Sequence, residues 1–244
     1  MVLAIDIGNT RTKGTVYERD ALVHEFAVVE KDWQKKVLST LERFADITDL
    51  VVASVGKTQK DALKMFEHLA KVHFVTHESR FPFENKYATP QTLGIDRMVL
   101  ASGSVLKFPG QNRLVIDAGT CITYDYTDAA DNYLGGAISP GIRMRYEALH
   151  TFTARLPLLE REIPLDEIGN STAFSIHSGV VNGVVNEIDG FIDSCRKRWP
   201  NFIIILTGGD SEFLAKRLKN TIFANSNFLM ESLNLIFQFG LDDQ

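Results

Sequence analysis

The sequence has few cysteines. Cys121 and Cys195 lie far apart and form no Cys-x-x-Cys pair. Two isolated cysteines without a zinc-type or redox spacing are typical of reduced thiols in an intracellular protein. The sequence therefore argues against a disulfide framework and favours a cytoplasmic location.

Long apolar runs and clusters of basic residues are also missing. No stretch approaches the roughly 18 apolar residues that a membrane span requires. The apolar N-terminus is interrupted by Asp6, where the core of a signal peptide would continue. With a net charge of −5 and no run of Lys or Arg, the chain has no nucleic-acid footprint. We expect neither membrane nor nucleic acid as a partner, and any phosphate must be neutralised by backbone N–H groups, single cations and metal ions.

Several common catalytic signatures are absent. Gly56-Lys57-Thr58 resembles the end of a P-loop, but Val51 stands where that motif needs a glycine. No Gly-x-Ser-x-Gly nucleophile elbow occurs. His73 and His77 would share one face of a predicted strand without a third ligand, so we do not expect a metal site there.

What is present is the composition of a globular protein, with 244 residues of which 45% are hydrophobic and 23% charged. Hydrophobic periodicity predicts strands and helices that alternate in two similar halves. In the first half we expect strands at 2–7, 13–18, 21–29, 49–55 and 72–76, with helices at 32–44 and 57–70. In the second half we expect strands at 115–118, 121–126, 133–139 and 202–207, with helices at 142–154, 171–199, 210–218 and 228–239.

The two halves share a motif. An apolar strand ends in Asp-x-Gly and a small polar residue at Asp6-Ile7-Gly8 and again at Asp117-Ala118-Gly119. Chance recurrence of a common turn is the alternative. Three meandering strands followed by alternating helix and strand, twice, resemble the actin/hexokinase/sugar-kinase superfamily. The predicted fold class is α/β, with duplicated actin-like (ribonuclease H-like) lobes and an inter-lobe cleft. The turn at Phe108-Pro109-Gly110 predicts lobes at 1–108 and 109–244.

Two glycine turns are candidates for nucleotide binding. In the turn at 6–13, Gly8 allows backbone to approach a phosphate, Lys13 adds a cation and Asp6 could hold Mg²⁺, directly or through water. The paired glycines of Thr207-Gly208-Gly209 would let backbone lie flat against an adenosine. An ordinary hairpin and an ordinary strand-to-helix turn remain the alternatives.

The segment from Tyr87 to Arg97 is a candidate acceptor site. Pro90 suits the first turn of a helix, and Gly94 leaves an open patch beside the next residues. Asp96 could take a proton from a hydroxyl, and Arg97 could grip a carboxylate. The alternative is an exposed Asp–Arg surface pair.

Seven motifs in register resemble type III pantothenate kinases and span nearly the whole chain. They are Asp-x-Gly-Asn-Thr at 6–10, Pro-x-x-Leu-Gly-x-Asp-Arg at 90–97, Asp-Ala-Gly-Thr-x-Ile-Thr-x-Asp at 117–125, Gly-Gly-x-Ile-x-Pro-Gly at 135–141, Gly-x-Ser-Thr at 169–172, Ser-Gly at 178–179 and Thr-Gly-Gly at 207–209. The resemblance implies an ATP:pantothenate 4′-phosphotransferase, a homodimer that makes 4′-phosphopantothenate in the first step of coenzyme A biosynthesis.

The resemblance also implies roles for individual residues. ATP would be contacted by Asp6, Ile7, Gly8, Asn9, Thr10, Arg11, Thr12, Lys13 and Thr120. Asp117 would bind a monovalent cation, K⁺ or NH₄⁺. Pantothenate would be contacted by Tyr87, Gly94, Ile95, Asp96, Arg97 and Thr172, with Asp96 as general base. The apolar helices from Ser171 onward would form the dimer.

Some positions depart from the family pattern, and two other functions stay open. The departures are Cys121, His177, Asn186 and Ser232, and none falls on a proposed catalytic position. One alternative function is a sugar or amino-sugar kinase of the same fold, which would not need the segment at 87–97. The other is a nucleotide-binding accessory factor for transcription, which would act through protein partners.

Overall fold

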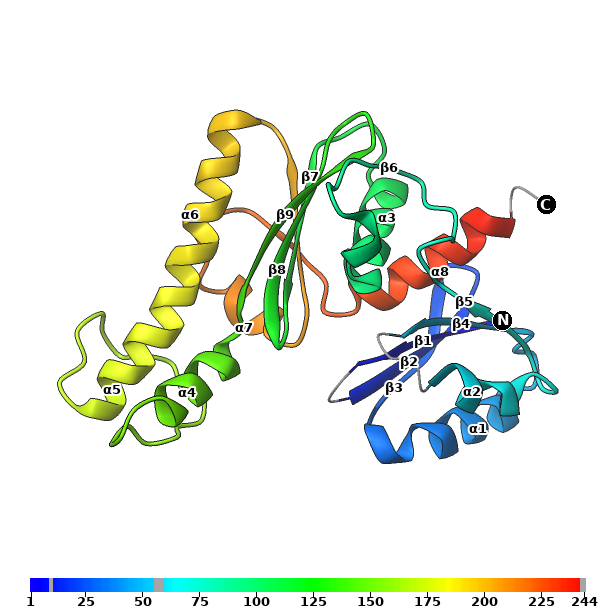
Figure 1. The fold of residues 1–244 in the computed structure, drawn as a ribbon, viewed down its shortest axis with the longest axis horizontal. Helices are drawn as coiled ribbons and strands as arrows, with labels where there is room; N and C mark the ends of the chain where they lie inside the picture. Colours follow the sequence, from blue (N-terminus) through cyan, green and yellow to red (C-terminus); the bar gives the residue numbers. More distant parts are fainter. Residues whose placement is uncertain (9–10, 55–58, 242–244) are drawn as a thin grey trace. The chain divides into compact units, whose positions relative to one another are not determined.

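The computed structural model describes residues 1–8, 11–54 and 59–241. It divides into two compact units, drawn with their elements labelled in Figure 1. The first comprises Met1–Pro109 together with Asn227–Gln244, and the second comprises Gly110–Ser226. The division falls within the predicted turn, but the C-terminal segment belongs to the first unit, whereas the sequence analysis placed it in the second.

The first unit contains a sheet with the strand order β3-β2-β1-β4-β5. The first three strands form an antiparallel meander, and β4 and β5 continue the sheet in parallel. The strands are β1 (Val2–Ile7), β2 (Arg11–Glu18), β3 (Ala21–Val29), β4 (Asp49–Ser54) and β5 (Lys71–Phe74). All five predicted strands of this half are therefore present.

The strands of the second unit repeat this arrangement. Their order is β9-β8-β7-β10-β11, again an antiparallel meander followed by parallel strands. They are β7 (Arg113–Ala118), β8 (Cys121–Thr127), β9 (Asn132–Pro140), β10 (Ile203–Thr207) and β11 (Phe223–Ala224). The predicted duplication is confirmed, with Asp6 on β1 and Asp117 on β7 at equivalent places.

Helices cover both faces of the first sheet. Because side chains alternate along a strand, Leu3, Ile5 and Ile7 pack with α1 (Trp33–Arg43), whereas Ala4 faces a second cluster containing α3 (Ile95–Lys107) and α8 (Phe228–Leu241). The helices α3 and α8 pack closely, since a Cβ at Gly103 would lie 1.9 Å from the Ser232 hydroxyl. This packing fixes α3, whose first turn carries Asp96.

The remaining helical segments of the first unit are short. They are η1 (Glu30–Asp32), α2 (Gln59–Leu63), η2 (Lys64–Phe66) and η3 (Pro90–Thr92), and a two-residue strand β6 (Glu84–Asn85) precedes η3. The helix predicted at 57–70 is thus shorter than expected. The Glu67 N–H bonds to the Lys64 carbonyl, a tighter i→i+3 turn that closes the helix before β5.

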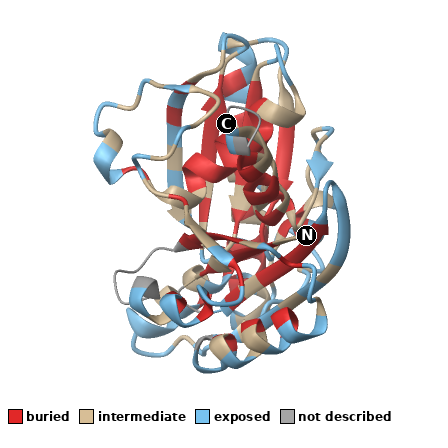
Figure 2. Cartoon of the chain, turned by 90° about the vertical axis from the view of Figure 1, so that its right-hand side faces the viewer, coloured by how far each residue is buried: buried red, intermediate tan, exposed pale blue. Residues whose placement is uncertain are grey.

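The second unit is built around one long helical rod. The rod consists of α5 (Thr172–His177), a π-helical turn η4 (Ser178–Asn182) and α6 (Gly183–Arg198), which follow without a break, as predicted for 171–199. Its buried residues, including Val180, Val184, Ile188 and Ile192, pack on the second sheet. The other helices are α4 (Ile142–Thr151) and α7 (Ser211–Ala215). Figure 2 shows buried residues concentrated in the strands of both sheets.

Within the described residues, no helix is long and apolar enough to cross a membrane.

Candidate functional site

The carboxylate of Asp6 lies near the end of β1 in a charged environment. The strand register sets it opposite Lys13 of β2 and Ala53 of β4. Burial raises the pKa of Asp6 to about 6; the Lys13 cation opposes this rise and the Asp96 carboxylate adds to it. Lys13 and Asp96 therefore lie close enough to Asp6 for their charges to affect its carboxyl group.

Asp96 lies in the first turn of α3, two residues after Gly94. Its Oδ1 accepts a hydrogen bond of 2.9 Å from the Arg97 backbone N–H, and the positive end of the helix dipole favours an anion there. A Cβ at position 94 would lie only 2.4 Å from Asp96 Oδ1. The glycine is thus required for the observed placement of the carboxylate.

Arg97 is 5% exposed, and its guanidinium lies 5.8 Å from the centroid of the Tyr87 ring. The Tyr87 backbone N–H is in turn held by the Asn85 side chain at 2.9 Å. Buried Arg side chains are rare in proteins unless they are paired. The alternative of an exposed Asp–Arg surface pair is therefore wrong, and Arg97 lies buried over the ring of Tyr87.

Pro90 does not start the helix that carries Asp96. It begins the separate turn η3, after which Leu93 is extended, with ψ of 127°, and buried. Gly94 is also non-helical, with ψ of 138°, and α3 starts at Ile95. Pro90 thus stands in the first turn of a short 3₁₀ helix, as expected, whereas α3 is a separate helix that the sequence analysis did not predict.

The turn between β1 and β2 is only partly within the described residues. Asn9 and Thr10 lie outside them, as do Gly56, Lys57 and Thr58. The Gly8 N–H donates to the Arg11 carbonyl at 3.1 Å and so closes the hairpin. Among the predicted ATP-contact residues, Ile7 is part of the core and Thr12 is fully buried. Any contact that these two make with a nucleotide must therefore come from their backbone.

Asp117 and Thr120 lie at the equivalent turn of the second unit. Asp117 pairs with Thr207 across β7 and β10, and the Asp210 N–H bonds to the Ala118 carbonyl at 3.0 Å. Gly208 has a φ of +93°, which favours glycine. A Cβ there would lie 2.3 Å from Asp117 Oδ1 and 2.4 Å from the Ala118 oxygen. The Asp117 carboxylate and the Ala118 carbonyl thus point into one small space beside Gly208, which a side chain at this position would fill.

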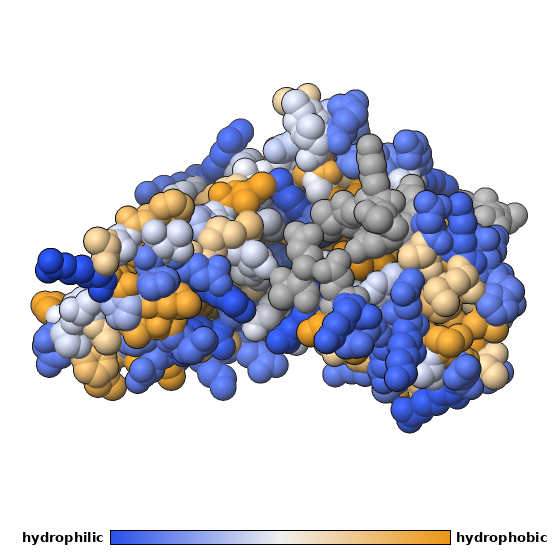
Figure 3. Space-filling view, turned by 60° about the horizontal axis from the view of Figure 1, so that its bottom comes forward, coloured by the Kyte–Doolittle hydropathy of each residue, from blue (hydrophilic) through white to orange (hydrophobic). Residues whose placement is uncertain are grey.

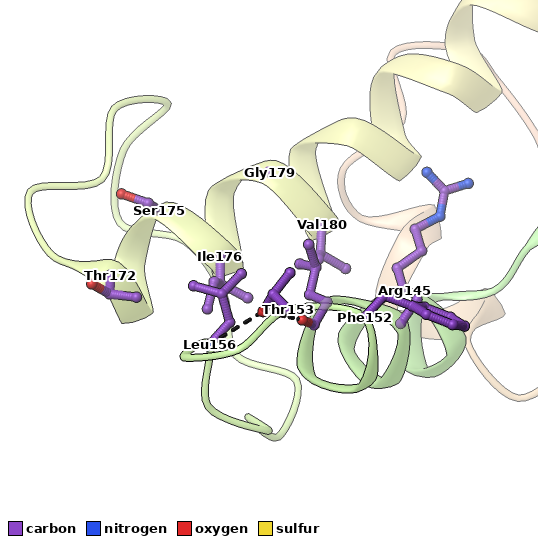
Figure 4. Close-up of a pocket in the computed structure, with 11 residues that line it drawn as sticks. Arg145, Phe152, Thr153, Leu156, Thr172, Ser175, Ile176, Gly179 and Val180 are labelled. Carbon is purple, nitrogen blue, oxygen red and sulfur yellow. Dashed lines mark hydrogen bonds between the residues drawn. The ribbon is translucent and has the colours of Figure 1, made fainter.

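Thr172 lies elsewhere in the second unit, at the start of α5. It lines an open groove of about 860 Å³ between α4 and the α5–η4 rod, shown in Figure 4. Ile176 and Val180 point from the rod toward Thr153 and Leu156. The other lining residues are Arg145, Ala148, Leu149, Phe152, Ser175 and Gly179. Asp117, Thr120 and Gly208 do not line this groove.

The same end of the second unit exposes large hydrophobic side chains. Phe152 is 85% exposed, Leu165 82% and Ile168 83%, and Leu158 and Ile163 are also exposed. Figure 3 shows hydrophobic residues interspersed with hydrophilic ones at this end, on the left. Several large apolar side chains exposed in one region make this end a candidate interaction surface.

No preformed metal cluster stands out among the described residues: none of their His, Cys, Asp and Glu side chains gather in groups of three or more. His73 is bound to Asp49 at 2.7 Å, and His77 lies beyond the end of β5 against the Leu93 carbonyl at 2.9 Å. The two rings do not share a strand face as predicted.

Comparison with known proteins identifies the family. The family model described as type III pantothenate kinase matches residues 2–194. A type III pantothenate kinase from Flavobacterium johnsoniae is 62% identical over 243 residues, which is 100% of both chains. The chain belongs to the type III pantothenate kinase family.

Solved structures with a similar fold support the architecture. A Campylobacter jejuni protein, conjecturally described as a Baf family transcriptional activator, has a TM-score of 0.67 at 23% identity and covers 98% of this chain and 99% of its own. A ROK family glucokinase from Streptomyces griseus, in complex with glucose and AMPPNP, has a TM-score of 0.56 at 9% identity over 98% of each chain. At such identities the likeness shows the fold alone. The predicted actin- and hexokinase-like fold class is confirmed.

For a member of this kinase family, the structure brings the predicted residues into separate groups. Asp6, Lys13 and Asp96 interact in the first unit, Asp117 and Thr120 share a turn in the second, and Thr172 lines the groove. The sequence analysis missed the groove residues on α4. The signal was there, because Ala148, Leu149 and Phe152 recur at helical spacing, but it did not distinguish an exposed face from a core face.

Proposed function

We propose that this chain transfers the γ-phosphoryl group of ATP to the primary hydroxyl of pantothenate and so makes 4′-phosphopantothenate. The family membership supports the substrate, and one structural feature carries the site: the Asp96 carboxylate lies at the start of α3, close enough to the half-buried Asp6 to add to the rise in its pKa. An acceptor base close to a phosphate- and metal-handling carboxylate is the arrangement that phosphoryl transfer needs.

In this proposal the acceptor segment positions pantothenate. Asp96 orients the hydroxyl and accepts its proton, and because the transition state is loose, this transfer can come late. Arg97 pairs with the pantothenate carboxylate, since its planar guanidinium suits two parallel hydrogen bonds. Its contact with Tyr87 holds it in place. Gly94, Ile95 and Thr172 complete the proposed acceptor contacts.

In the first unit we propose that the turn from Asp6 to Lys13 contacts the ATP phosphates and that Asp6 holds Mg²⁺, directly or through water. The residues present fit this ion, because burial and a neighbouring carboxylate leave Asp6 short of positive charge, as its raised pKa reflects. When bound, Mg²⁺ supplies charge neutralisation on the phosphates. Lys13, which lies opposite Asp6 in the strand register, would add a flexible cation.

In the second unit we propose that Thr120 contacts ATP, that Gly208 and Gly209 face the adenosine, and that Asp117 binds K⁺ or NH₄⁺. The cradle at Gly208 fits such an ion, since carboxylate and carbonyl oxygens are the donors that hard cations prefer. Replacement of K⁺ by Na⁺ in an assay should then lower turnover strongly. Equal rates in the two salts would remove this assignment.

We propose a homodimer formed through the exposed apolar end of the second unit. A groove lined by Leu149 and Val180, next to the exposed Phe152, Leu165 and Ile168, offers a surface that a second copy could cover. Sedimentation at assay concentration should give about twice the chain mass of 27.3 kDa. A fully active monomer would contradict this. Since Cys121 and Cys195 are both free thiols, we also propose a cytoplasmic location.

A coupled assay tests the proposed function. It contains ATP, Mg²⁺, K⁺ and pantothenate, and mass spectrometry identifies the product. We expect phosphopantothenate to form, with sugars and amino sugars left unmodified in parallel reactions. Sugar phosphorylation without phosphopantothenate would overturn the proposal in favour of a sugar kinase. ATP binding without any turnover would favour an accessory role instead.

A further inference from the structure

The carboxylate of Glu187 on α6 gathers three other elements of the second unit. Its Oε1 accepts hydrogen bonds from the Tyr124 hydroxyl of β8, at 3.0 Å, and from the Ser139 hydroxyl of β9. Its Oε2 accepts from Arg145 Nη2 of α4 at 2.6 Å. Burial works to raise the pKa of Glu187, but the hydrogen bonds from Ser139, Arg145 and Tyr124 outweigh it and hold the pKa below its ordinary value.

Arg145 connects this carboxylate to the end of β9. While Nη2 binds Glu187, Nε donates to the Pro140 carbonyl at 2.8 Å. Figure 4 shows the Arg145 side chain extending from α4 toward the α6 ribbon and away from the other groove residues. The segment Ser139–Pro140–Gly141 is therefore held from two sides by one carboxylate, through the Ser139 hydroxyl and through the Arg145 guanidinium.

The segment Ser139–Gly141 packs directly against the turn at Asp117–Thr120. The Gly141 N–H donates to the Thr120 carbonyl at 3.0 Å. A Cβ at position 141 would lie 2.2 Å from the Gly119 oxygen and 2.5 Å from the Thr120 oxygen, so the two backbones are in direct contact. A displacement of Pro140 would therefore be transmitted to Gly119 and Thr120.

We propose that Glu187 is a positioning residue for nucleotide binding: through Arg145 and Ser139 it holds the Ser139–Gly141 segment against Gly119 and Thr120. The inference rests on the proposed function, in which Thr120 contacts ATP. The contacts traced here run from Glu187 to Thr120, the proposed ATP contact. Losing them should therefore weaken ATP binding more than pantothenate binding.

Glu187→Gln tests this with little change in shape. Glutamine presents an N–H donor or a neutral oxygen to Arg145, so the charge-assisted bond is lost and Arg145 can leave Pro140. We expect the KM for ATP to rise about five- to twentyfold, the loss of one such bond, while the KM for pantothenate and kcat change by less than about threefold. The melting temperature should fall by only a few degrees, about what one partly exposed bond contributes.

Arg145→Lys separates the two contacts of the arginine. Lysine keeps a positive charge for Glu187, but a single ammonium cannot also serve the Pro140 carbonyl in the fork geometry. We expect the KM for ATP to rise about three- to tenfold. Because both residues act along one path, their effects should not add. The KM for ATP of the double variant should exceed that of the more impaired single variant by no more than about twofold. Glu147→Gln is the matched control, since it removes the carboxylate of an exposed arginine–glutamate pair, Arg143–Glu147, on the same helix α4.

Calorimetric titration of MgATP into the full-length protein, without pantothenate, separates this inference from the proposed function. If the parent binds ATP but does not phosphorylate pantothenate, the proposed function fails, while a selective weakening of ATP binding in Glu187→Gln still supports the inference. ATP affinities within about twofold of the parent in both variants would overturn it. So would equal losses for ATP and pantothenate that follow the melting temperature. A parent protein that binds no ATP would overturn both proposals.

Discussion

Gly94→Ala should impair catalysis without unfolding the protein. Gly94 has a φ of −59° and a ψ of 138°, which alanine adopts without strain. The added methyl group would lie 2.4 Å from Asp96 Oδ1, 3.5 Å from Asp96 Cγ and 3.8 Å from Arg97 Cγ. Only the carboxylate oxygen is too close. Asp96 can therefore relieve the contact by moving its side chain roughly 1 Å, the scale of displacement that commonly lowers a rate about 10²-fold.

The stability effects of this change nearly cancel. Loss of the hydrogen bond from the Arg97 N–H to Asp96 costs about 1 kcal/mol, and the reduced freedom of the unfolded chain at position 94 returns about 0.4–1 kcal/mol. Steady-state assays of pantothenate phosphorylation should show kcat lower by about 10²-fold, with urea unfolding nearly unchanged.

Gly240→Ala serves as the control for the same substitution in the same unit, because nothing lies within 4 Å of a Cβ there. It should keep full activity. If Gly94→Ala folds normally and keeps kcat within about threefold of the parent, the placement of Asp96 does not matter for the reaction, and the reasoning is refuted.

Two further predictions concern Arg97 and Asp6. Arg97→Lys loses the planar guanidinium that can form two parallel hydrogen bonds with a carboxylate. The KM for pantothenate should therefore rise about 10- to 100-fold, which corresponds to the loss of one charge-assisted pair, while the KM for ATP changes little. A rise in the KM for ATP instead would contradict the proposed role of Arg97. The pKa of Asp6, raised from 3.8 to about 6, means that the folded protein keeps a proton that the unfolded chain has already released. This contribution of Asp6 to stability is therefore full below about pH 4 and is lost as the pH rises to about 6. Metal-free urea unfolding of Asp6→Asn should lack this loss, and parallel pH profiles for parent and variant would count against the raised pKa.

The repeated meander could be predicted because its strands and turns depend on local sequence patterns. Strand alternation and the two Asp-x-Gly turns placed Asp6 and Asp117 correctly at equivalent strand ends. The proposed acceptor residues form a local motif that the sequence displays, but the burial of Arg97 could not be predicted, since arginine is usually exposed. Its burial depends on Tyr87 and on the packing around α3.

Features that depend on distant contacts could not be predicted from local patterns. The C-terminal helix α8 joins the first unit because Ser232 packs against Gly103 of α3, more than a hundred positions earlier in the chain. The cluster around Glu187 joins one helix to two strands and another helix, and none of its residues stands out in sequence. The helix α3 was also missed, although Pro90 was placed correctly at the start of the short turn η3 that precedes it.

The most direct test of the account is the turnover of pantothenate by Asp96→Asn compared with the parent, with the phosphorylated product identified by mass. Asparagine keeps the shape of the side chain and can still hydrogen-bond a hydroxyl, but it is a far poorer proton acceptor. The account predicts that the parent makes phosphopantothenate and that kcat of the variant falls by about 10²- to 10⁴-fold, while ATP and pantothenate still bind within about tenfold. A normally folded Asp96→Asn protein with kcat within about threefold of the parent would contradict the assignment of Asp96 as the base, and a parent that leaves pantothenate unmodified would contradict the proposed function.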